Sequence, residues 1–219
     1  MRNINSILFD FDGVIVESNN IKTQAFYSLY IDYGEDIAKA VVNHHKQNMG
    51  ISRFEKIKLY HKKFLGKALN GSDYNELLNK FSISVMDKTI RSPYVSGSYE
   101  FIKSNFTIFD QYIITATPMS EIEKITKKRN IYKYFKKVLG SPNSKDFWVK
   151  HLIDNKKIDS KSSIFIGDAK ADKQAALDND ITFILRKTNE NKNLQNSTHY
   201  DAISDFHDLV KIINRLNRV

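Results

Sequence analysis

The stretch Ile7–Ser18, ILFDFDGVIVES, places two acidic residues directly behind a short apolar run. Such a run, bounded by turn residues, is typical of a buried strand in an α/β protein. Burying one unpaired carboxylate is costly, and burying two close together costs more. Asp10 and Asp12 therefore predict that this strand ends where its sheet opens into a polar site, and Gly13 allows the chain to turn there.

Four more short apolar runs follow and are predicted as strands at residues 111–116, 137–141, 163–168 and 182–186. Helical patterns lie between and after them, at residues 118–129, 145–155 and 171–179. Thr117 is expected to be the N-cap of the first of these helices, with Pro118 at its first position. The alternation of strands and helices predicts a parallel sheet covered by helices on both faces, which is an α/β fold.

One long segment interrupts the alternation of strands and helices, because it shows helical periodicity and no convincing strand. Its clearest apolar stripe consists of Ile21, Ala25, Phe26, Leu29, Tyr30 and Tyr33. We predict a compact helical domain over residues 17–91, inserted into a core that is formed by residues 1–16 and 92–219.

The composition excludes several classes of site and partner. The chain of 219 residues has no cysteine, so thiol nucleophiles, disulfides and zinc-thiolate sites are excluded. The net charge of +9 fits the steering of an anionic small substrate, and it equally fits a plain solvated basic surface. No nucleic-acid-reading motif accompanies the charge, and no apolar run is long enough to span a membrane. We expect a cytoplasmic protein without a nucleic-acid or membrane partner, and a homo-oligomer is left open.

Polar residues of unusual kind follow the other predicted strands. Thr115 ends the second strand, Lys145 follows the third, and Asp168 and Asp172 follow the fourth. Ligands of parallel α/β sheets bind at the carboxyl ends of the strands, so these side chains are expected to converge with Asp10. Converging carboxylates repel one another unless a hard cation lies among them, and oxygen ligands alone favour Mg²⁺. This set suits phosphoryl transfer, with one carboxylate attacking phosphorus and a second moving protons.

The segments DFDGV, ITATP, GSPNSK and GDAKAD, in this order, resemble the four motifs of the haloacid dehalogenase-like hydrolase superfamily. The inserted helical segment resembles the C1-type cap of that superfamily. The whole chain is similar to its branch of phosphoglycolate phosphatases and β-phosphoglucomutases. The resemblance implies a Rossmann-like α/β core, Mg²⁺ as cofactor and an aspartyl-phosphate intermediate.

The resemblance also implies roles for the catalytic residues. Asp10 matches the nucleophile, and Asp12 matches the general acid and base. Thr115 matches the hydroxyl that holds the transferring phosphoryl group, with the backbone N–H of Ala116 in support. Lys145 matches the lysine that neutralises the nucleophile and the phosphate.

A metal site is implied in the same way. Asp10, the backbone carbonyl of Asp12 and the carboxylate of Asp168 match metal ligands, and Asp172 matches a supporting acid. Gly13 matches the point where the chain turns close to the phosphate of the substrate. The dehalogenases and phosphonatases of the superfamily lack an aspartate two residues after the nucleophile, so Asp12 indicates phosphate-ester chemistry.

The segment GISRFEK resembles the substrate-facing loop of C1-capped members. Ser52 and Arg53 would then meet the non-transferring end of the substrate, where Arg53 would grip a second phosphate or a carboxylate. The alternative is a helix N-terminus with Ser52 as N-cap and Arg53 merely exposed. Lys56 is a weaker candidate for substrate contact, and His44 and His45 are expected to lie at the surface or to pack within the cap.

The sequence thus predicts a Mg²⁺-dependent phosphatase that acts on a small phosphorylated metabolite such as a sugar or sugar-acid phosphate. A sugar phosphomutase of the β-phosphoglucomutase type would use the same catalytic residues and is the alternative. A non-catalytic binding protein on the same fold is disfavoured, because a protein without activity has no reason to keep these buried acids.

Overall fold

The computed structural model describes residues 3–196 and 199–218, and within them six parallel strands form one sheet in the order β3-β2-β1-β4-β5-β6. Their bounds are β1 Ser6–Phe9, β2 Asp110–Pro118, β3 Lys137–Ser141, β4 Ser163–Gly167, β5 Thr182–Arg186 and β6 Asp201–Ile203. Ile7 of β1 pairs with Gln111 of β2 on one side and with Ile164 of β4 on the other. The strand before Asp10 is therefore central in the sheet. The five strands expected from the sequence are confirmed, whereas β6 was not predicted.

Helices cover both faces of the sheet, as the alternating pattern predicts. They are α5 Ser98–Asn105, α6 Met119–Lys128, α7 Lys145–Asp154, α8 Lys170–Leu177, the short α9 Lys192–Gln195 and α10 Leu209–Leu216. Successive side chains of a strand point to opposite faces. Accordingly Ile7 and Phe9 pack in the apolar cluster that includes α5, α6 and α10, and Leu8 packs in the cluster that includes α7 and α8.

The helix expected at residues 118–129 begins one residue later than predicted, and its predicted cap is wrong. Strand β2 continues through Pro118, and α6 starts at Met119 without a side-chain N-cap bond. The hydroxyl of Thr117 donates instead to a carboxylate oxygen of Asp12 at 2.9 Å, so it does not cap the helix.

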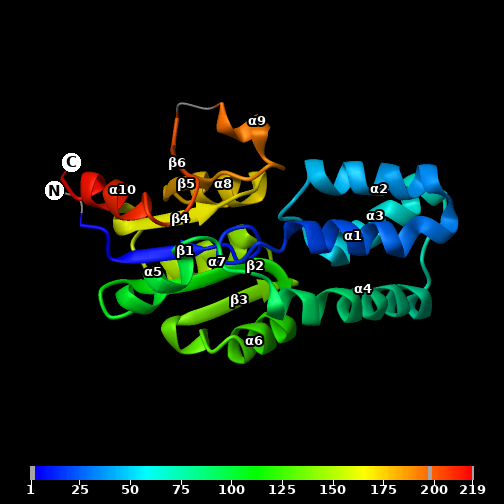
Figure 1. Ribbon diagram of the computed structural model, residues 1–219, viewed down its shortest axis with the longest axis horizontal. Helices are drawn as coiled ribbons and strands as arrows, with labels where there is room; N and C mark the ends of the chain where they lie inside the picture. Colours follow the sequence, from blue (N-terminus) through cyan, green and yellow to red (C-terminus); the bar gives the residue numbers. More distant parts are fainter. Residues whose placement is uncertain (1–2, 197–198, 219) are drawn as a thin grey trace.

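Between β1 and α5 the chain forms four α-helices, which are α1 Asn19–Tyr30, α2 Glu35–Gln47, α3 Arg53–Leu65 and α4 Gly71–Arg91. They have an apolar cluster of their own, built around Phe26, Tyr30, Tyr60 and Phe81. Figure 1 shows these helices together at one end of the molecule, beyond the ends of the strands. We call them the cap, and the division into domains at residues 16 and 91 stays a prediction. Among the described residues no helix is both long and apolar enough to cross a membrane.

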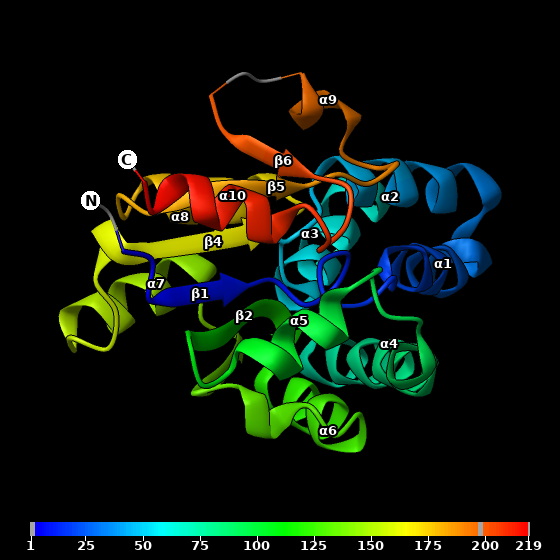
Figure 2. The same cartoon turned by 60° about the vertical axis from the view of Figure 1, so that its left-hand side comes forward.

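The two ends of the cap meet beside the sheet. The backbone N–H of Glu17 donates to the carbonyl of Pro93 at 2.9 Å, which joins the two connections. Arg129 of the core donates to the carbonyls of Ile90 and Ser92 at the end of α4, at 2.5 and 2.9 Å. Figure 2 shows β1 and β4 with their arrowheads directed at the cap, so the carboxyl ends of the strands face it. Any site at these ends lies between core and cap.

Candidate active site

Asp10 directly follows β1 and is held from two sides. One of its carboxylate oxygens accepts the backbone N–H of Phe11 at 2.7 Å, and the other lies 2.9 Å from Nζ of Lys145. Lys145 is the first residue of α7, and Ser144 caps this helix by accepting the N–H of Phe147. The capped helix start fixes the direction in which the lysine leaves the backbone. The first and third motifs are therefore brought into direct contact.

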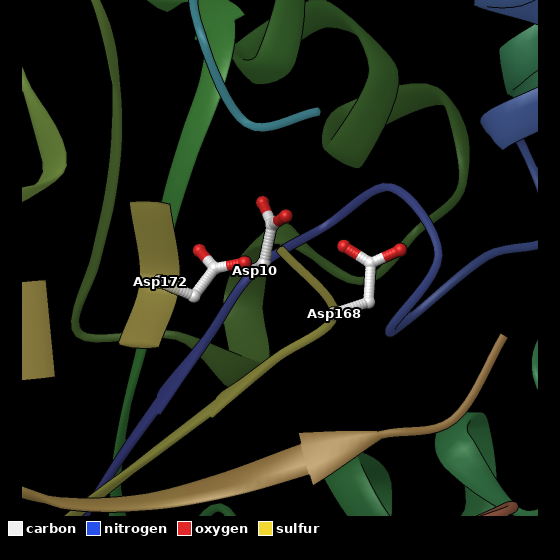
Figure 3. Close-up of side chains that lie close together, drawn as sticks. All are labelled: Asp10, Asp168 and Asp172. Carbon is white, nitrogen blue, oxygen red and sulfur yellow. The ribbon is translucent and has the colours of Figure 1, made fainter. Parts of the chain in front are cut away.

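Asp10, Asp168 and Asp172 form a buried acidic cluster, in which one carboxylate oxygen of each residue lies within 4.8 Å of the others (Figure 3). Asp172 accepts the backbone N–H of Ala169 at 3.0 Å and also pairs with Lys145. Burial, together with the charges of Asp172 and Asp12, raises the pKa of Asp10 to about 7 even though Lys145 opposes the shift. Burial and the charges of Asp10 and Asp172 raise the pKa of Asp168 well above its usual range.

This electrostatic picture bears on the predicted metal. One lysine faces three buried carboxylates, so the cluster has more negative charge than its surroundings offset. A site of carboxylate oxygens with excess negative charge fits a hard divalent cation such as Mg²⁺. Asp10 and Asp168 are placed to ligate such an ion. Asp172 accepts from Lys145 and from the backbone N–H of Ala169, and its supporting role stays a prediction.

Gly13 provides space in this cluster. Its φ is +77°, a conformation that L side chains rarely adopt, and a Cβ added there would lie 2.2 Å from a carboxylate oxygen of Asp168. The same Cβ would lie 2.3 Å from Nδ2 of Asn19, which donates to Asp168 at 2.6 Å. The glycine therefore permits the first motif, the start of α1 and the fourth motif to meet.

The Asp12 carboxylate lies outside the acidic cluster and faces the cap. It accepts hydrogen bonds from Ser18 and Thr117 and pairs with Lys22 of α1. Burial alone would raise the pKa of Asp12, but Lys22 and the two hydroxyls outweigh burial and lower it. The Asp12 carboxylate is thus separate from the acidic cluster, and its role in moving protons stays a prediction.

Lys22 and Thr117 belong to this site and were missed by the sequence analysis. Thr117 had a recognisable signal, because it lies two residues after Thr115 on the same strand and so faces the same side. Lys22 had none, since nothing local in a helix start shows that its side chain will reach a core residue. Thr115 is 1% exposed, and its hydroxyl accepts the N–H of Thr117 at 3.2 Å.

A cavity lies between core and cap, with a volume of about 40 Å³. The core contributes Asp10, Asp12, Thr115, Ala116 and Asp168 to its lining, and the cap contributes Lys22, Phe26, His45, Arg53, Lys56 and Phe81 among others. A neighbouring opening of about 250 Å³ runs between the cap loop that includes Ser52 and the core segment that includes Lys145. The predicted catalytic residues thus converge, and several cap cations face them.

Of the two cap residues predicted to bind substrate, Ser52 is the N-cap of α3, where its side chain accepts the N–H of Phe54. Arg53 is 5% exposed, so the alternative of an exposed arginine is wrong. Its guanidinium forms two hydrogen bonds to Glu121 of α6, at 2.7 and 3.1 Å, and a third to Ser82 at 2.8 Å. Through these bonds Arg53 joins the cap to the core. Its contact with substrate stays a prediction.

Glu121→Gln is expected to lower the free energy of unfolding by about 3 kcal/mol, because it leaves the buried Arg53 without its carboxylate partner. Urea unfolding followed by circular dichroism measures this change. Glu123→Gln is the matched control, since Glu123 lies on the same helix in an exposed pair with Lys127 at 3.5 Å. That control should cost less than about 0.5 kcal/mol. Equal effects of the two substitutions would show that the Arg53–Glu121 pair does not join cap to core.

Residues 7–186 match the family model of the haloacid dehalogenase-like hydrolases. The match spans most of the chain, so the chain belongs to this family and is an enzyme of the hydrolase class. The resemblance read from the four motifs is thereby confirmed. No curated protein sequence matches the chain significantly.

Solved structures similar to the chain share its fold at low sequence identity. A predicted phosphoglycolate phosphatase of Haemophilus somnus is 18% identical, with a TM-score of 0.73 over 97% of this chain and 99% of that one. A predicted phosphatase of Clostridium acetobutylicum is 18% identical, with a TM-score of 0.72 over 99% and 100% of the two chains. The protein assigned as the HAD-hydrolase YfnB of Bacillus subtilis, bound to magnesium, is 16% identical, with a TM-score of 0.70 over 97% and 100%.

Proposed function

We propose that this enzyme is a Mg²⁺-dependent phosphatase that hydrolyses a small phosphorylated metabolite through an aspartyl-phosphate on Asp10. The observation that carries the proposal is the buried contact of Asp10 with Lys145 beside Asp168 and Asp172, at the carboxyl ends of the strands. Structures of the same fold that are named as predicted phosphatases support this reading, as does the one bound to magnesium. A sugar or sugar-acid phosphate in the cytoplasm is the substrate class that we expect.

In the first half of the reaction, a carboxylate oxygen of Asp10 attacks phosphorus and the bond from phosphorus to the leaving oxygen breaks. Asp12 donates a proton to that oxygen, so the product leaves as an alcohol. A bound phosphate adds negative charge beside Asp12, which raises the pKa of this carboxyl and favours the protonated form that the step needs. Lys145 offsets the charge of Asp10 and of the transferring group, and Thr115 binds one of its oxygens.

In the second half, Asp12 takes a proton from a water molecule, whose oxygen attacks phosphorus. The bond between phosphorus and Asp10 breaks, which releases inorganic phosphate and restores the free carboxylate. Asp12 ends the cycle protonated, as the next cycle requires. Magnesium held by Asp10, Asp168 and the backbone carbonyl of Asp12 would act as a Lewis acid toward the phosphoryl oxygens.

Phosphate release tests this function directly. A set of phosphorylated metabolites is incubated with the protein in Mg²⁺ or in EDTA, and inorganic phosphate is measured. We expect release that requires Mg²⁺. Conversion of a hexose 1-phosphate into the 6-phosphate without phosphate release would instead identify a mutase, and no turnover of any ester would contradict an enzyme of this kind.

A further inference from the structure

Asn191 lies in the loop between β5 and α9 and makes as many hydrogen bonds as its amide allows. It is 5% exposed, and its Nδ2 donates to the carbonyl oxygens of Asp168 and Arg186, both at 2.8 Å. Its Oδ1 accepts the backbone N–H of Thr188 at 2.9 Å and Nε2 of Gln195 at 2.8 Å. Two donated and two accepted bonds are the full capacity of a side-chain amide. A residue bonded in this way holds the groups around it in fixed places.

One of these bonds reaches Asp168, which is placed to ligate the metal. The peptide bond that follows Asp168 is held at both of its polar atoms. Its carbonyl oxygen accepts from Asn191, and its N–H, which belongs to Ala169, donates to Asp172 at 3.0 Å. A peptide held at both ends keeps one orientation, so the Cα–Cβ bond of Asp168 keeps its direction as well.

The amide of Asn191 acts where two neighbouring strands separate. β4 and β5 are paired as far as Gly167 and Leu185. The carbonyls of the next residues, Asp168 and Arg186, both accept from Asn191. These two residues are buried, so water does not readily replace a donor that is lost there. Removal of the amide is therefore expected to release the backbone just after the fourth motif's strand.

The carboxylate of Asp168 is held by a second amide. One of its oxygens accepts from Nδ2 of Asn19, the first residue of α1, at 2.6 Å. This bond leaves the other oxygen for a cation. Asn19 thus orients the side chain and Asn191 orients the backbone, so that Asp168 needs little rearrangement when a cation binds. Loss of a group that orients a metal ligand typically costs about 10- to 100-fold in metal affinity.

We propose that Asn191 is a positioning residue of the metal site, which holds the backbone of Asp168 so that its carboxylate meets the cation in one geometry. The proposal rests on the Mg²⁺-dependent phosphatase function above and gives the loop after β5 a part in it. Asn191 lies outside the four motifs and acts through Asp168. Its removal should therefore weaken the affinity for the metal more than it slows the enzyme once the metal is bound.

Binding of Mn²⁺ to the protein without substrate tests the proposal. Mn²⁺ takes the same oxygen ligands as Mg²⁺, and the electron paramagnetic resonance signal of the unbound ion gives its Kd. We expect Asn191→Ala to weaken Mn²⁺ binding about 10- to 100-fold. The Mg²⁺ concentration for half-maximal hydrolysis of p-nitrophenyl phosphate should rise by a similar factor, and saturating Mg²⁺ should restore most of kcat. Asn193→Ala is the control, because Asn193 lies exposed on α9, and it should leave both values unchanged.

Gln195→Met separates the positioning of Asp168 from the stability of the loop. Gln195 donates to the carbonyl of Thr188 at 2.7 Å and to Oδ1 of Asn191, so its removal loosens the loop and leaves both donors of Asn191 in place. We expect Gln195→Met to lower the Tm in EDTA, as Asn191→Ala does, and to keep the Kd for Mn²⁺ near the wild-type value. Where Asn191→Ala does not fold, Asn191→Ser replaces it, because a hydroxyl has one proton and cannot donate to both carbonyls.

An Asn191→Ala protein with a lower Tm and an unchanged Kd for Mn²⁺ would overturn the proposal, since Asn191 would then only stabilise the loop. Equal losses of Mn²⁺ binding in Asn191→Ala and Gln195→Met would overturn it as well, because the bond to Asp168 would not be the cause. In both cases a wild type that releases phosphate with Mg²⁺ leaves the proposed function standing. A wild type that hydrolyses no phosphate ester contradicts that function, and the Mn²⁺ comparison then judges Asn191 alone.

Discussion

Asp10→Asn is expected to lower the rate of p-nitrophenyl phosphate hydrolysis by a factor on the order of 10⁴ or more, as loss of a nucleophile does in other hydrolases. The amide nitrogen and oxygen of asparagine are poor nucleophiles toward phosphorus, so no covalent intermediate forms. The fold should persist, because Asp172 still pairs with Lys145 and the amide fills the same space. The measurement is the initial rate with saturating Mg²⁺, together with a circular dichroism spectrum.

Asp154→Asn serves as the control for this prediction. Asp154 is an exposed carboxylate at the end of α7, the helix that begins with Lys145, and the same change of charge there should leave the rate at the wild-type value. Asp10→Asn with the rate of Asp154→Asn would remove Asp10 from the role of nucleophile.

Lys145→Met is expected to destabilise the protein as well as inactivate it. Nζ of Lys145 lies 2.9 Å from the carboxylate of Asp10 and also pairs with Asp172, and all three side chains are buried. Among the described residues, no other cation pairs with these two carboxylates. Removal of Lys145 leaves them uncompensated, so the free energy of unfolding should fall by about 3–5 kcal/mol. Urea unfolding in EDTA measures the change without a contribution from added metal.

The combination of Lys145→Met with Asp172→Asn checks the cause of that loss. The second substitution removes one of the carboxylates that Lys145 offsets, so the double variant should regain part of the stability and none of the activity. Additive losses, with the double variant less stable than either single one, would mean that Lys145 stabilises the protein by packing rather than by charge.

The motif residues could be predicted from the sequence because the topology places them. Parallel strands bring their carboxyl ends to one edge, so Asp10, Thr115 and Asp168 converge whatever their distance in the chain. Lys145 could be placed for the same reason, because its helix starts at that edge of the sheet. Asp172 lies in the first turn of the helix that follows the fourth motif's strand, so it is brought to the same edge.

What could not be predicted depends on how the cap docks on the core. Arg53 was expected to be exposed or to grip substrate, and its carboxylate partner Glu121 is 68 residues away on another helix. Lys22 likewise reaches Asp12 only because α1 packs over the strand ends. His44 and His45 were expected to lie at the surface or to pack within the cap, and His45 is buried there. Its contact with Lys56 joins two helices whose relative register no local pattern specifies. Tertiary packing decides these contacts, and local periodicity does not report it.

One prediction from local sequence, the N-cap role of Thr117, was wrong. Thr117 before Pro118 has the pattern of a helix N-cap followed by a proline at the first helical position. In the structure the same hydroxyl bonds to Asp12, a buried carboxylate that needs donors more than the helix start does. A residue that satisfies a local rule can be required elsewhere, and active sites are where this is most expected.

The most direct test of the central claim is to detect the aspartyl-phosphate. Asp12→Asn removes the group that activates water, while p-nitrophenyl phosphate has a leaving group that needs little acid assistance, so the intermediate should accumulate. We predict a burst of about one p-nitrophenolate per enzyme, as covalent catalysis gives when its second step is slow. Borohydride reduction and peptide mass spectrometry should then find the modified side chain at Asp10. A protein that turns over without a burst and carries no phosphate on Asp10, or carries it on another residue, would contradict the account.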